Sequence, residues 1–252
     1  MQLITKGRYR VRLAETPADI RAAQRLRHLA FHPDETHSEA HPHSEALDHD
    51  RFDALCQHVL IEDRTDAQLV CCFRGLELES GAEIGSSYSA QFYDLDALTA
   101  FCGRMMEIGR FCIHPDRSDD PDILRLAWAS LARHVESRSI KMMFGCSSFQ
   151  GTDQAQYLDT FALLKSKHLA PPEWRPRIKA QQVFRFGARL RRMPDRRKAL
   201  QAMPPLLRTY LMMGGWVSDH AVIDAEMDTL HVFTGVEISA IPAARRNLLL
   251  AV

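Results

Sequence analysis

The sequence predicts an α/β protein with a mixed central sheet flanked by helices. Short apolar strands alternate along the chain with segments whose apolar residues recur at helical spacing, which is typical of α/β folds. The chain has 252 residues, of which 46% are hydrophobic and 25% charged, so it can bury a large core. We expect residues 1–190 to form the core domain and residues 191–252 a C-terminal extension packed on it.

The first elements can be placed from local signals. Residues 8–13 alternate enough for a strand, and Thr16 and Pro17 are typical of the N-cap and first position of a helix. Residues 31–48 form a polar loop, whose length suggests a mobile or substrate-covering segment. Two strands joined by a hairpin turn are then expected at 58–62 and 68–77.

The remaining elements alternate in type. Residues 80–90 are a Gly/Ser-rich connection, 95–102 a short helix, and 105–115 a strand that ends at a proline. Asp119-Asp-Pro-Asp122 caps an amphipathic helix with one apolar stripe. Further expected elements are a buried strand at 140–146, a polar turn at 147–153, a helix at 154–165, a strand at 181–186, an apolar segment at 204–213 and a last strand at 229–238.

Composition also limits location. No apolar run approaches the roughly 20 residues that span a bilayer, and residues 1–12 lack the apolar region of a signal peptide. The six cysteines form no CxxC motif, so we expect reduced, buried thiols in a cytoplasmic protein.

Charge is balanced overall but unevenly distributed. Residues 34–66 are acidic and rich in histidine, whereas residues 165–198 are strongly basic. Such a basic patch suits an acidic protein, an anionic membrane surface or nucleic acid, or is simply a solvated face. Few aromatic residues interrupt it, so we expect no nucleic-acid partner. The histidines at 37–49 fit no standard metal spacing, so we expect no metal.

The strand expected at 105–115 carries two charges that a structural strand has little reason to hold. Glu107 and Arg110 flank Gly109, and a glycine within a strand often marks a bulge or a close approach by a backbone or ligand. Together these residues suggest a site where an amine loses a proton beside exposed backbone N–H groups. An edge-strand salt bridge with a packing glycine is the alternative.

Several segments resemble one branch of the GNAT acyltransferase superfamily. FGCSSFQGTD at 144–153, EIGR at 107–110 and the run from Pro204 to Asp224 are similar to the bacterial L-ornithine N-α-acyltransferases. Gln57 and Gln150 depart from that family's pattern, where Asp and Pro are expected. The resemblance spans about residues 25–228 and implies a GNAT-like fold with transfer of a 3-hydroxyacyl group from acyl carrier protein to the α-amine of L-ornithine. It implies no cofactor beyond the phosphopantetheine of the carrier.

A more distant resemblance is to acyl-homoserine-lactone synthases, although the tryptophan that this group has shortly after Phe31 is absent. Glu107 and Arg110 fall on that group's Glu-x-x-Arg motif. The resemblance to the lactone synthases implies substrate-binding roles for residues on that group's arginine–phenylalanine helix, acidic stretch and strand arginine: Arg27, Phe31, Asp50, Asp53 and Arg74. The resemblance to the ornithine acyltransferases implies the same for residues of the FGCSSFQGTD segment: Phe144, Cys146, Ser147 and Ser148.

N-acylation assigns chemical roles to these residues. Glu107 is the candidate general base, and the N–H groups around Gly109 the candidate oxyanion hole. Arg110, with Arg27 or Arg74, suits the ornithine carboxylate. Asp50 and Asp53 suit its distal ammonium group, or merely cap the start of a helix.

The distribution of charge favours acyl carrier protein over CoA as the acyl donor. The turn at 115–122 has no glycine and four aspartates, which would repel the pyrophosphate of CoA. An acidic carrier protein can instead dock on the basic segment, for which we select Arg175, Arg177 and Lys179. The product is amphiphilic, so we also expect transient contact with the anionic inner membrane surface. The alternatives are an N-acyl amino acid or acyl-homoserine-lactone type synthase using another amine, and a non-catalytic carrier-protein-binding module.

Overall fold

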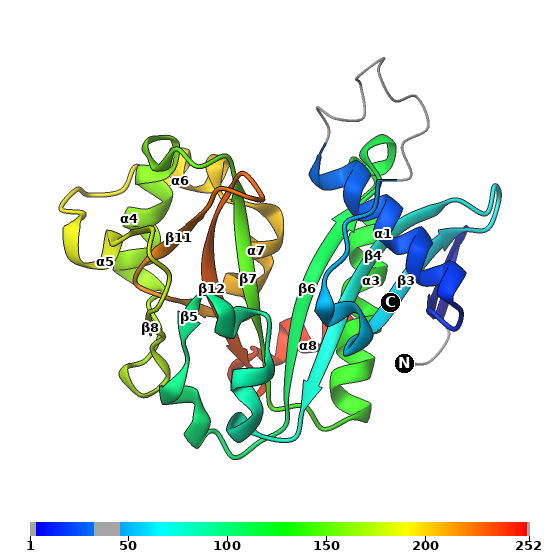
Figure 1. Cartoon of the computed structure of the whole chain (residues 1–252), viewed down its shortest axis with the longest axis horizontal. Helices are drawn as coiled ribbons and strands as arrows, with labels where there is room; N and C mark the ends of the chain where they lie inside the picture. The colour runs from blue at the N-terminus through cyan, green and yellow to red at the C-terminus, as the bar shows by residue number, and fades with distance from the viewer. Residues whose placement is uncertain (1–3, 33–45, 251–252) are drawn as a thin grey trace. The chain divides into compact units, whose positions relative to one another are not determined.

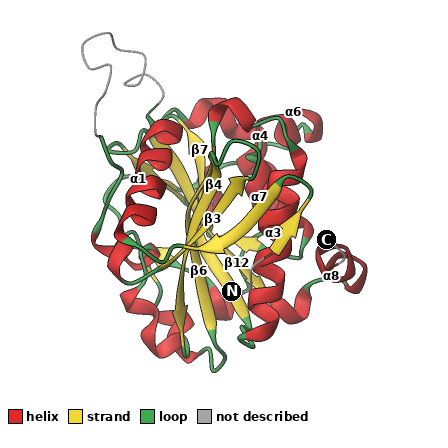
Figure 2. Ribbon diagram, turned by 90° about the vertical axis from the view of Figure 1, so that its right-hand side faces the viewer, coloured by secondary structure: helices red, strands yellow, loops and turns green. Residues whose placement is uncertain are grey.

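The computed structural model describes residues 4–32 and 46–250, with the backbone alone for 247–250. Strands and helices alternate along the chain, which confirms the predicted α/β class with a mixed central sheet (Figures 1 and 2). The chain forms two compact units: the first contains residues up to Leu76, Ile108–Ser139 and residues from Ala243, and the second contains Glu77–Glu107 and Ile140–Pro242. These contacts group the chain differently from the expected division after residue 190.

The first unit is a sheet with helices. Its strands follow the order β1-β2-β3-β4-β6, and β1 to β4 are antiparallel. Its elements are β1 (Ile4–Lys6), β2 (Tyr9–Leu13), α1 (Pro17–Phe31), a 3₁₀ turn (Arg51–Ala54), β3 (Gln57–Asp63), most of β4 (Leu69–Leu78) and of β6 (Met105–Ile113), a 3₁₀ turn (Pro115–Arg117), α3 (Pro121–Ser137) and α8 (Ala243–Leu250).

Helices α1 and α3 lie against opposite faces of this sheet, on either side of β3 and β4 in Figure 1. Arg12 of β2 pairs with Asp19 of α1 at 2.6 Å. Tyr9 of the same strand donates from its hydroxyl to Asp120, the N-cap of α3, also at 2.6 Å. Tyr9 and Arg12 are three residues apart on β2, and side chains an odd number of residues apart on a strand point to opposite faces of the sheet. Helices α1 and α3 therefore cover different faces.

The predicted start of α1 is confirmed. Thr16 is the N-cap, its hydroxyl accepts the N–H of Asp19, and Asp19 accepts the N–H of Thr16 in return. This capping box satisfies two N–H groups that the helix itself leaves without partners. The loop predicted at 31–48 falls largely on residues 33–45, which lie outside the described residues.

The second unit is built on the long antiparallel pair β7–β12. Its strands follow the order β6-β7-β12-β11-β9, β10 also pairs with β12, and the β6–β7 contact is parallel. Its main elements are β5 (Tyr93–Asp94), β7 (Met142–Gln150), α4 (Leu158–Lys167), β8 (Arg177–Ile178), β9 (Val183–Phe184), α5 (Phe186–Arg189), α6 (Arg196–Ala202), α7 (Pro205–Met212), β10 (Trp216–Val217), β11 (Ala221–Asp224) and β12 (Thr229–Glu237). Five 3₁₀ turns lie before β6 or flank α4 and another follows β12: Gly81–Ser86, Ser89–Gln91, Asp96–Ala100, Gln154–Tyr157, Pro172–Trp174 and Ile238–Ala240.

The polar turn predicted at 147–153 is wrong in its first half. Strand β7 continues to Gln150, and Ser147 and Ser148 pair with Val232 and His231 of β12. Ser147 is buried and its hydroxyl accepts a hydrogen bond from Thr234 at 2.9 Å, while Ser148 is exposed. The polar residues thus follow the in–out alternation of a strand, held by a partner more than 80 residues away in sequence.

Other differences are smaller. The strand expected at 181–186 shortens to β9, and Phe186 begins α5. Elements that we did not predict include α6, α8, β10 and β11. The two strands among them pair with β12, so these short stretches acquire their structure from that distant partner.

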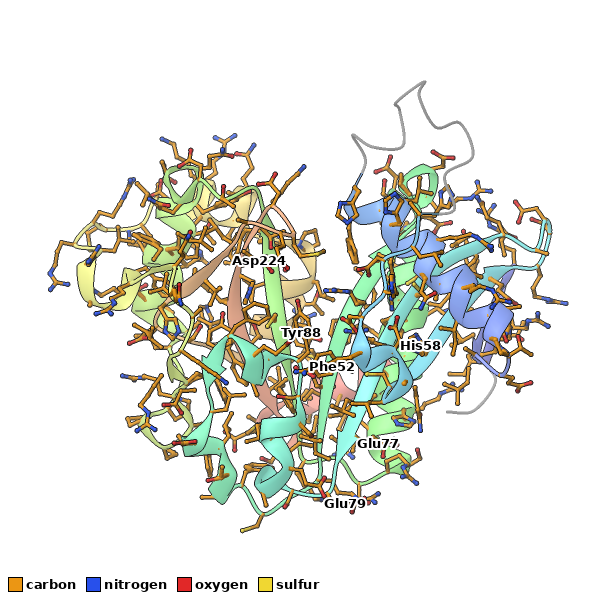
Figure 3. The ribbon with its side chains drawn as sticks, in the orientation of Figure 1. Phe52, His58, Glu77, Glu79, Tyr88 and Asp224 are labelled. Atoms are coloured by element: carbon orange, nitrogen blue, oxygen red, sulfur yellow. The ribbon has the colours of Figure 1, made fainter. Side chains whose placement is uncertain are left out.

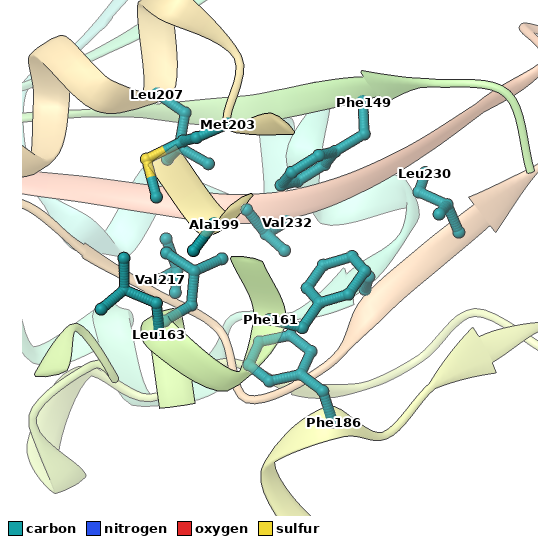
Figure 4. Packing of buried hydrophobic residues seen from close by; sticks show 12 residues of the cluster. Phe149, Phe161, Leu163, Phe186, Ala199, Met203, Leu207, Val217, Leu230 and Val232 are labelled. Atoms are coloured by element: carbon teal, nitrogen blue, oxygen red, sulfur yellow. The ribbon is translucent and has the colours of Figure 1, made fainter. Parts of the chain in front are cut away.

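Aromatic rings form the centre of the second unit's core (Figure 4). Phe161 of α4 is fully buried and stacks on Phe186 with 5.1 Å between ring centroids. Phe149 of β7 also contacts the ring of Phe161, with 5.1 Å between ring centroids. Phe161 therefore joins helix α4 to the sheet and to α5.

All six cysteines are free thiols, as predicted. The prediction that they are buried is confirmed for Cys71, Cys72 and Cys112, whereas Cys56 and Cys146 are half-buried and Cys102 is exposed. Among the described residues, every helix is too short or too polar to cross a membrane.

We expect Phe161→Ala to lower the free energy of unfolding by about 3–5 kcal/mol, because it empties the centre of this aromatic cluster. Urea denaturation measures the change. Leu55→Ala is the matched control, since Leu55 is 60% exposed and its truncation should cost less than about 0.5 kcal/mol. Equal losses in both variants would contradict the assignment of the core.

Candidate active site

Glu107 is a buried carboxylate held by backbone and hydroxyl donors of the second unit. Its side chain lies 5% exposed on β6. The N–H of Tyr88 donates to Oε2 at 2.7 Å, and the N–H and hydroxyl of Ser89 donate to Oε1 at 2.7 and 2.6 Å. Tyr88 is labelled in Figure 3. These three hydrogen bonds fix the orientation of the carboxylate.

The strand pairing explains why the carboxylate sits where it does. Strand β6 pairs with β7 over Met105–Glu107 only, and Glu107 lies opposite Phe144 in the last pair. Our sequence reasoning missed Tyr88 and Ser89. The only available signal was the Gly/Ser-rich composition of 80–90, which forms two 3₁₀ turns here rather than an open connection.

The predicted substrate-binding residues of β7 fall in different environments. Phe144 is buried and stacks on Phe233, whereas Ser148 is exposed. Cys146 is half-buried, with its Sγ 3.5 Å from the hydroxyl of Ser89. Cys146 therefore lies one contact away from Glu107, and its predicted contact with substrate, like those of Phe144, Ser147 and Ser148, stays a prediction.

The first unit contains a second polar centre, which we call the acid–arginine cluster: Arg27, Asp48, Asp50, Asp53, Arg74 and Arg110. Three arginines face three aspartates, so the cluster balances its own charge. Phe31, at the end of α1, is half-buried and packs on an apolar group of the same unit.

Arg27 is the most deeply buried member, with 0% exposure. Its guanidinium forms a bidentate pair with Asp53 at 2.8 and 2.9 Å and an ion pair with Asp48 at 2.8 Å, and it also donates to the Asp48 carbonyl. Gln24 donates to Asp53 at 2.9 Å, and His58 contacts the Asp53 carbonyl at 2.9 Å. Arg27 is thus paired with two aspartates, Asp48 and Asp53.

Arg74 and Arg110 complete the cluster nearer the surface. Arg74 pairs with both Asp50 and Asp53 at 2.6 Å, above the ring of Phe52, which Figure 3 labels with His58. Arg110 lies 3.0 Å from Asp48 and 3.4 Å from Asp50. The side chains of Asp50 and Arg110 are 21% and 13% exposed, so these two are the members that solvent reaches most.

The arginines favour the ionised forms of Asp50 and Asp53. Burial opposes ionisation of Asp53, but hydrogen bonds from Arg27 and Gln24 outweigh it, so the pKa of Asp53 lies below its ordinary value. The pKa of Asp50 is also lowered, because the contact with Arg74 outweighs burial. Burial lowers the pKa of His58, which favours the neutral ring beside these charges.

The irregularity that we predicted at Gly109 falls on its neighbour. Arg110 has a φ of +52°, a left-handed conformation that few residues other than glycine adopt. A Cβ at Gly109 would come no closer than 3.8 Å to Arg74, an ordinary contact. No described neighbour therefore requires glycine at 109, and its N–H remains a predicted donor to substrate.

The three predicted docking residues lie in the second unit and each has a partner. Arg177 pairs with Asp94 at 2.8 Å and Asp96 at 3.0 Å, Lys179 donates to the Ala90 carbonyl, and Arg175 to the Ala170 carbonyl. Arg175 and Arg177 also line an open hollow of about 670 Å³, together with Ile178 and Asp219. Whether this surface docks a carrier stays a prediction.

Comparison with known proteins identifies the family. Residues 26–128 match a model described as an acetyltransferase (GNAT) domain. The chain is 37% identical to the L-ornithine N(α)-acyltransferase of Rhodobacter capsulatus over 95% of this chain and 93% of that protein. This chain belongs to the L-ornithine N(α)-acyltransferase family.

A second member of the L-ornithine N(α)-acyltransferase family, from Brucella abortus, is 32% identical over 93% of this chain and 86% of that protein. Family membership confirms the resemblance found in the sequence and makes the chain an N-acyltransferase. A solved CoA-dependent acyl-homoserine lactone synthase covers 92% of this chain and 81% of its own, with 14% identity and a TM-score of 0.46.

Asp53→Asn should lower the free energy of unfolding by about 3–5 kcal/mol, because it removes one carboxylate from both of the buried guanidinium groups that it pairs with, those of Arg27 and Arg74. The matched control is Asp122→Asn, whose exposed pair with Arg125 contributes less than about 1 kcal/mol. Similar small losses in both variants would contradict a structural role for Asp53.

The cluster also predicts a pH dependence. Asp50 and Asp53 have folded pKa values below their unfolded values, so their contribution is complete above about pH 4 and is lost as the pH falls further. Urea denaturation between pH 7 and pH 3 should show wild-type stability falling below about pH 4, with a shallower fall in Asp53→Asn. Parallel curves would contradict the assignment.

Proposed function

We propose that this protein transfers a 3-hydroxyacyl group from acyl carrier protein to the α-amine of L-ornithine. The observation that carries the proposal is the 37% identity to the Rhodobacter capsulatus L-ornithine N(α)-acyltransferase over nearly the full length of both chains. The amine nitrogen attacks the thioester carbonyl directly. A C–N bond forms, the C–S bond breaks, and the products are lyso-ornithine lipid and the free thiol of the carrier's phosphopantetheine.

Glu107 removes the proton that blocks this attack. An α-ammonium group has a pKa of about 7.7–8.0, so most of it is protonated at neutral pH and cannot attack. The carboxylate of Glu107 is buried and oriented by Tyr88 and Ser89. It acts on the amine directly or through one water.

The tetrahedral intermediate carries a negative oxygen that needs donors. Backbone N–H groups around Gly109 are our candidates, and one such donor contributes about 3–4 kcal/mol in enzymes with an oxyanion hole. The first proton, which Glu107 takes from the ammonium group, passes on to water. The second leaves the nitrogen after the C–N bond forms and reaches the departing thiolate, so the products are the amide, the free thiol and one proton.

Ornithine also offers a carboxylate and a distal ammonium group. Arg110 and Asp50 come first among the predicted contacts, because they are the most exposed members of the acid–arginine cluster. Arg27, Arg74 and Asp53 have their charged groups turned toward one another, so their clearest effect is to hold the other two in place.

The choice of carrier protein over CoA is supported by the start of α3. The N-terminus of a helix binds phosphate when its N–H groups are open. Here Asp120 accepts the N–H of Asp122 at 3.0 Å and the hydroxyl of Tyr9 at 2.6 Å. The Asp120 carboxylate therefore lies at the helix N-terminus, where a pyrophosphate would need free N–H donors.

A matrix of donors and amines tests the proposal. Purified protein is incubated with 3-hydroxyacyl carrier protein or 3-hydroxyacyl-CoA and with L-ornithine, L-lysine, glycine or S-adenosylmethionine, and amides are measured by mass spectrometry. We expect amide from the carrier-bound donor with ornithine. Amide only with another amine supports a different synthase, and intact thioester with every amine supports a carrier-binding module.

Glu107→Gln should lower kcat by about 10²–10⁴-fold, because the amide cannot accept the proton. Both oxygens of Glu107 accept hydrogen bonds, so the amide nitrogen of the variant faces a donor, and we expect the free energy of unfolding to fall by about 1–3 kcal/mol. Glu226→Gln is the matched control, since Glu226 is exposed, and its turnover should be unchanged. Near-normal turnover of a folded Glu107→Gln variant would remove Glu107 from the mechanism.

Reversing the charges of Arg175, Arg177 and Lys179 should raise KM for the acyl carrier protein about tenfold and weaken its salt dependence, with KM for ornithine unchanged. Serine at the same positions should give a smaller rise. The control reverses Arg21, Arg25 and Arg208, which are exposed elsewhere. An unchanged KM for the carrier would place its docking face elsewhere.

A further inference from the structure

Residues Arg189–Lys198, which we call the basic loop, run in the second unit from the last residue of α5 through the connection to the first turn of α6. Figure 1 shows them as the yellow segment between these helices. The basic loop has six basic residues and a single acid, Asp195, and it contains no aromatic residue. It is the most concentrated positive charge in a chain whose net charge is zero.

The basic loop is anchored at its centre. Asp159 of α4 accepts hydrogen bonds from Arg192 at 2.7 Å and from the N–H of Asp195 at 2.9 Å. Lys165 donates to the Leu190 carbonyl at 2.7 Å. Asp195 is itself engaged, because it caps α6 through the N–H groups of Arg197 and Lys198. These hydrogen bonds fix the conformation of the basic loop, and the Asp195 carboxylate is engaged by backbone N–H groups of α6.

The other cations of the basic loop face solvent. Among residues 4–32 and 46–250, five of its six basic side chains have neither an ion pair nor a side-chain hydrogen bond, and all five are exposed: Arg189, Arg191, Arg196, Arg197 and Lys198. The contrast is with Arg177, which has two aspartate partners. Side chains without intramolecular partners are available for an external anion.

An apolar side chain stands among these cations. Met193 is 89% exposed, more than Leu55 at 60%, Met212 at 41% or Ile178 at 37%. Two arginines precede it and two follow Asp195. A flexible apolar side chain ringed by cations matches the interfacial anchors of peripheral proteins, whose apolar group enters the bilayer surface while basic groups bind phosphates.

We propose that the basic loop docks this enzyme on an anionic membrane surface, with Met193 entering the interface and the unpaired arginines contacting lipid phosphates. The proposal deepens the membrane contact that we expect from the amphiphilic product, and it does not depend on the transfer step. An acidic protein is the competing partner. The loop lacks the aromatic anchors typical of protein interfaces, and the hollow described above is lined by other residues.

Vesicle co-sedimentation of the full chain tests the loop. Vesicles of phosphatidylglycerol and phosphatidylcholine are compared with vesicles of phosphatidylcholine alone, for the wild type and for Arg191→Ser/Arg196→Ser/Arg197→Ser. Each basic residue at an anionic surface contributes about fivefold to partitioning, so we expect the triple variant to bind about a hundredfold more weakly. The control triple, Arg21→Ser/Arg25→Ser/Arg208→Ser, should stay within about twofold of the wild type.

Met193→Ser isolates the apolar contribution. We expect it to lower partitioning several-fold, whereas Met212→Ser leaves it unchanged. Amide formation from soluble substrates without vesicles should be unchanged in all these variants. A wild type that binds anionic vesicles but forms no amide would refute the transfer reaction and leave the docking surface standing.

Four results would overturn the docking surface: equal binding of the wild type to both kinds of vesicle, undiminished binding of the basic-loop triple, an equal loss in the control triple, or no effect of Met193→Ser. The carrier protein is titrated against the same variants. Loss of carrier binding with intact vesicle binding would assign the loop to a protein partner and also overturn the proposal.

Discussion

The hydrogen bonds that fix the Glu107 carboxylate are the interaction on which the proposed active site depends. Glu107 lies at the last position where β6 pairs with β7, and the donors that orient it come from a 3₁₀ turn almost 20 residues earlier in the chain. A buried carboxylate with hydrogen bonds on both oxygens is costly to form unless those donors are already in place. The turns at Gly81–Ser86 and Ser89–Gln91 are thus part of the site, and Ser89 connects it to Cys146.

The acid–arginine cluster serves a different purpose in the first unit. Its three arginines and three aspartates cancel in charge, and Arg27, Asp48, Asp53 and Arg74 are buried. Breaking one pair exposes the remaining charge to a low dielectric, which is why such clusters behave as a unit. The positive φ of Arg110 fits this view, because a strained backbone persists only where surrounding contacts determine it.

Local signals could be read from the sequence, and long-range ones could not. The capping box of α1 lies within four residues, so Thr16 and Pro17 indicate it directly. The strand around Glu107 was recognisable from its apolar residues and its proline stop. The second half of β7 depends on β12, and the hydrogen bonds of Tyr88 and Ser89 to Glu107 depend on tertiary packing. Family resemblance pointed to Asp50, Asp53 and Arg74, but only the structure brings in Asp48 and Gln24.

The central claim is that Glu107 receives the proton of the amine. A crystal structure with L-ornithine and an unreactive 3-hydroxyacyl-pantetheine amide, in place of the thioester, tests it most directly. We expect the α-nitrogen within about 2.6–3.2 Å of a Glu107 carboxylate oxygen, or of one water bound to that oxygen. An α-amine seated beyond the reach of one water from Glu107, against another acceptor, would contradict the account.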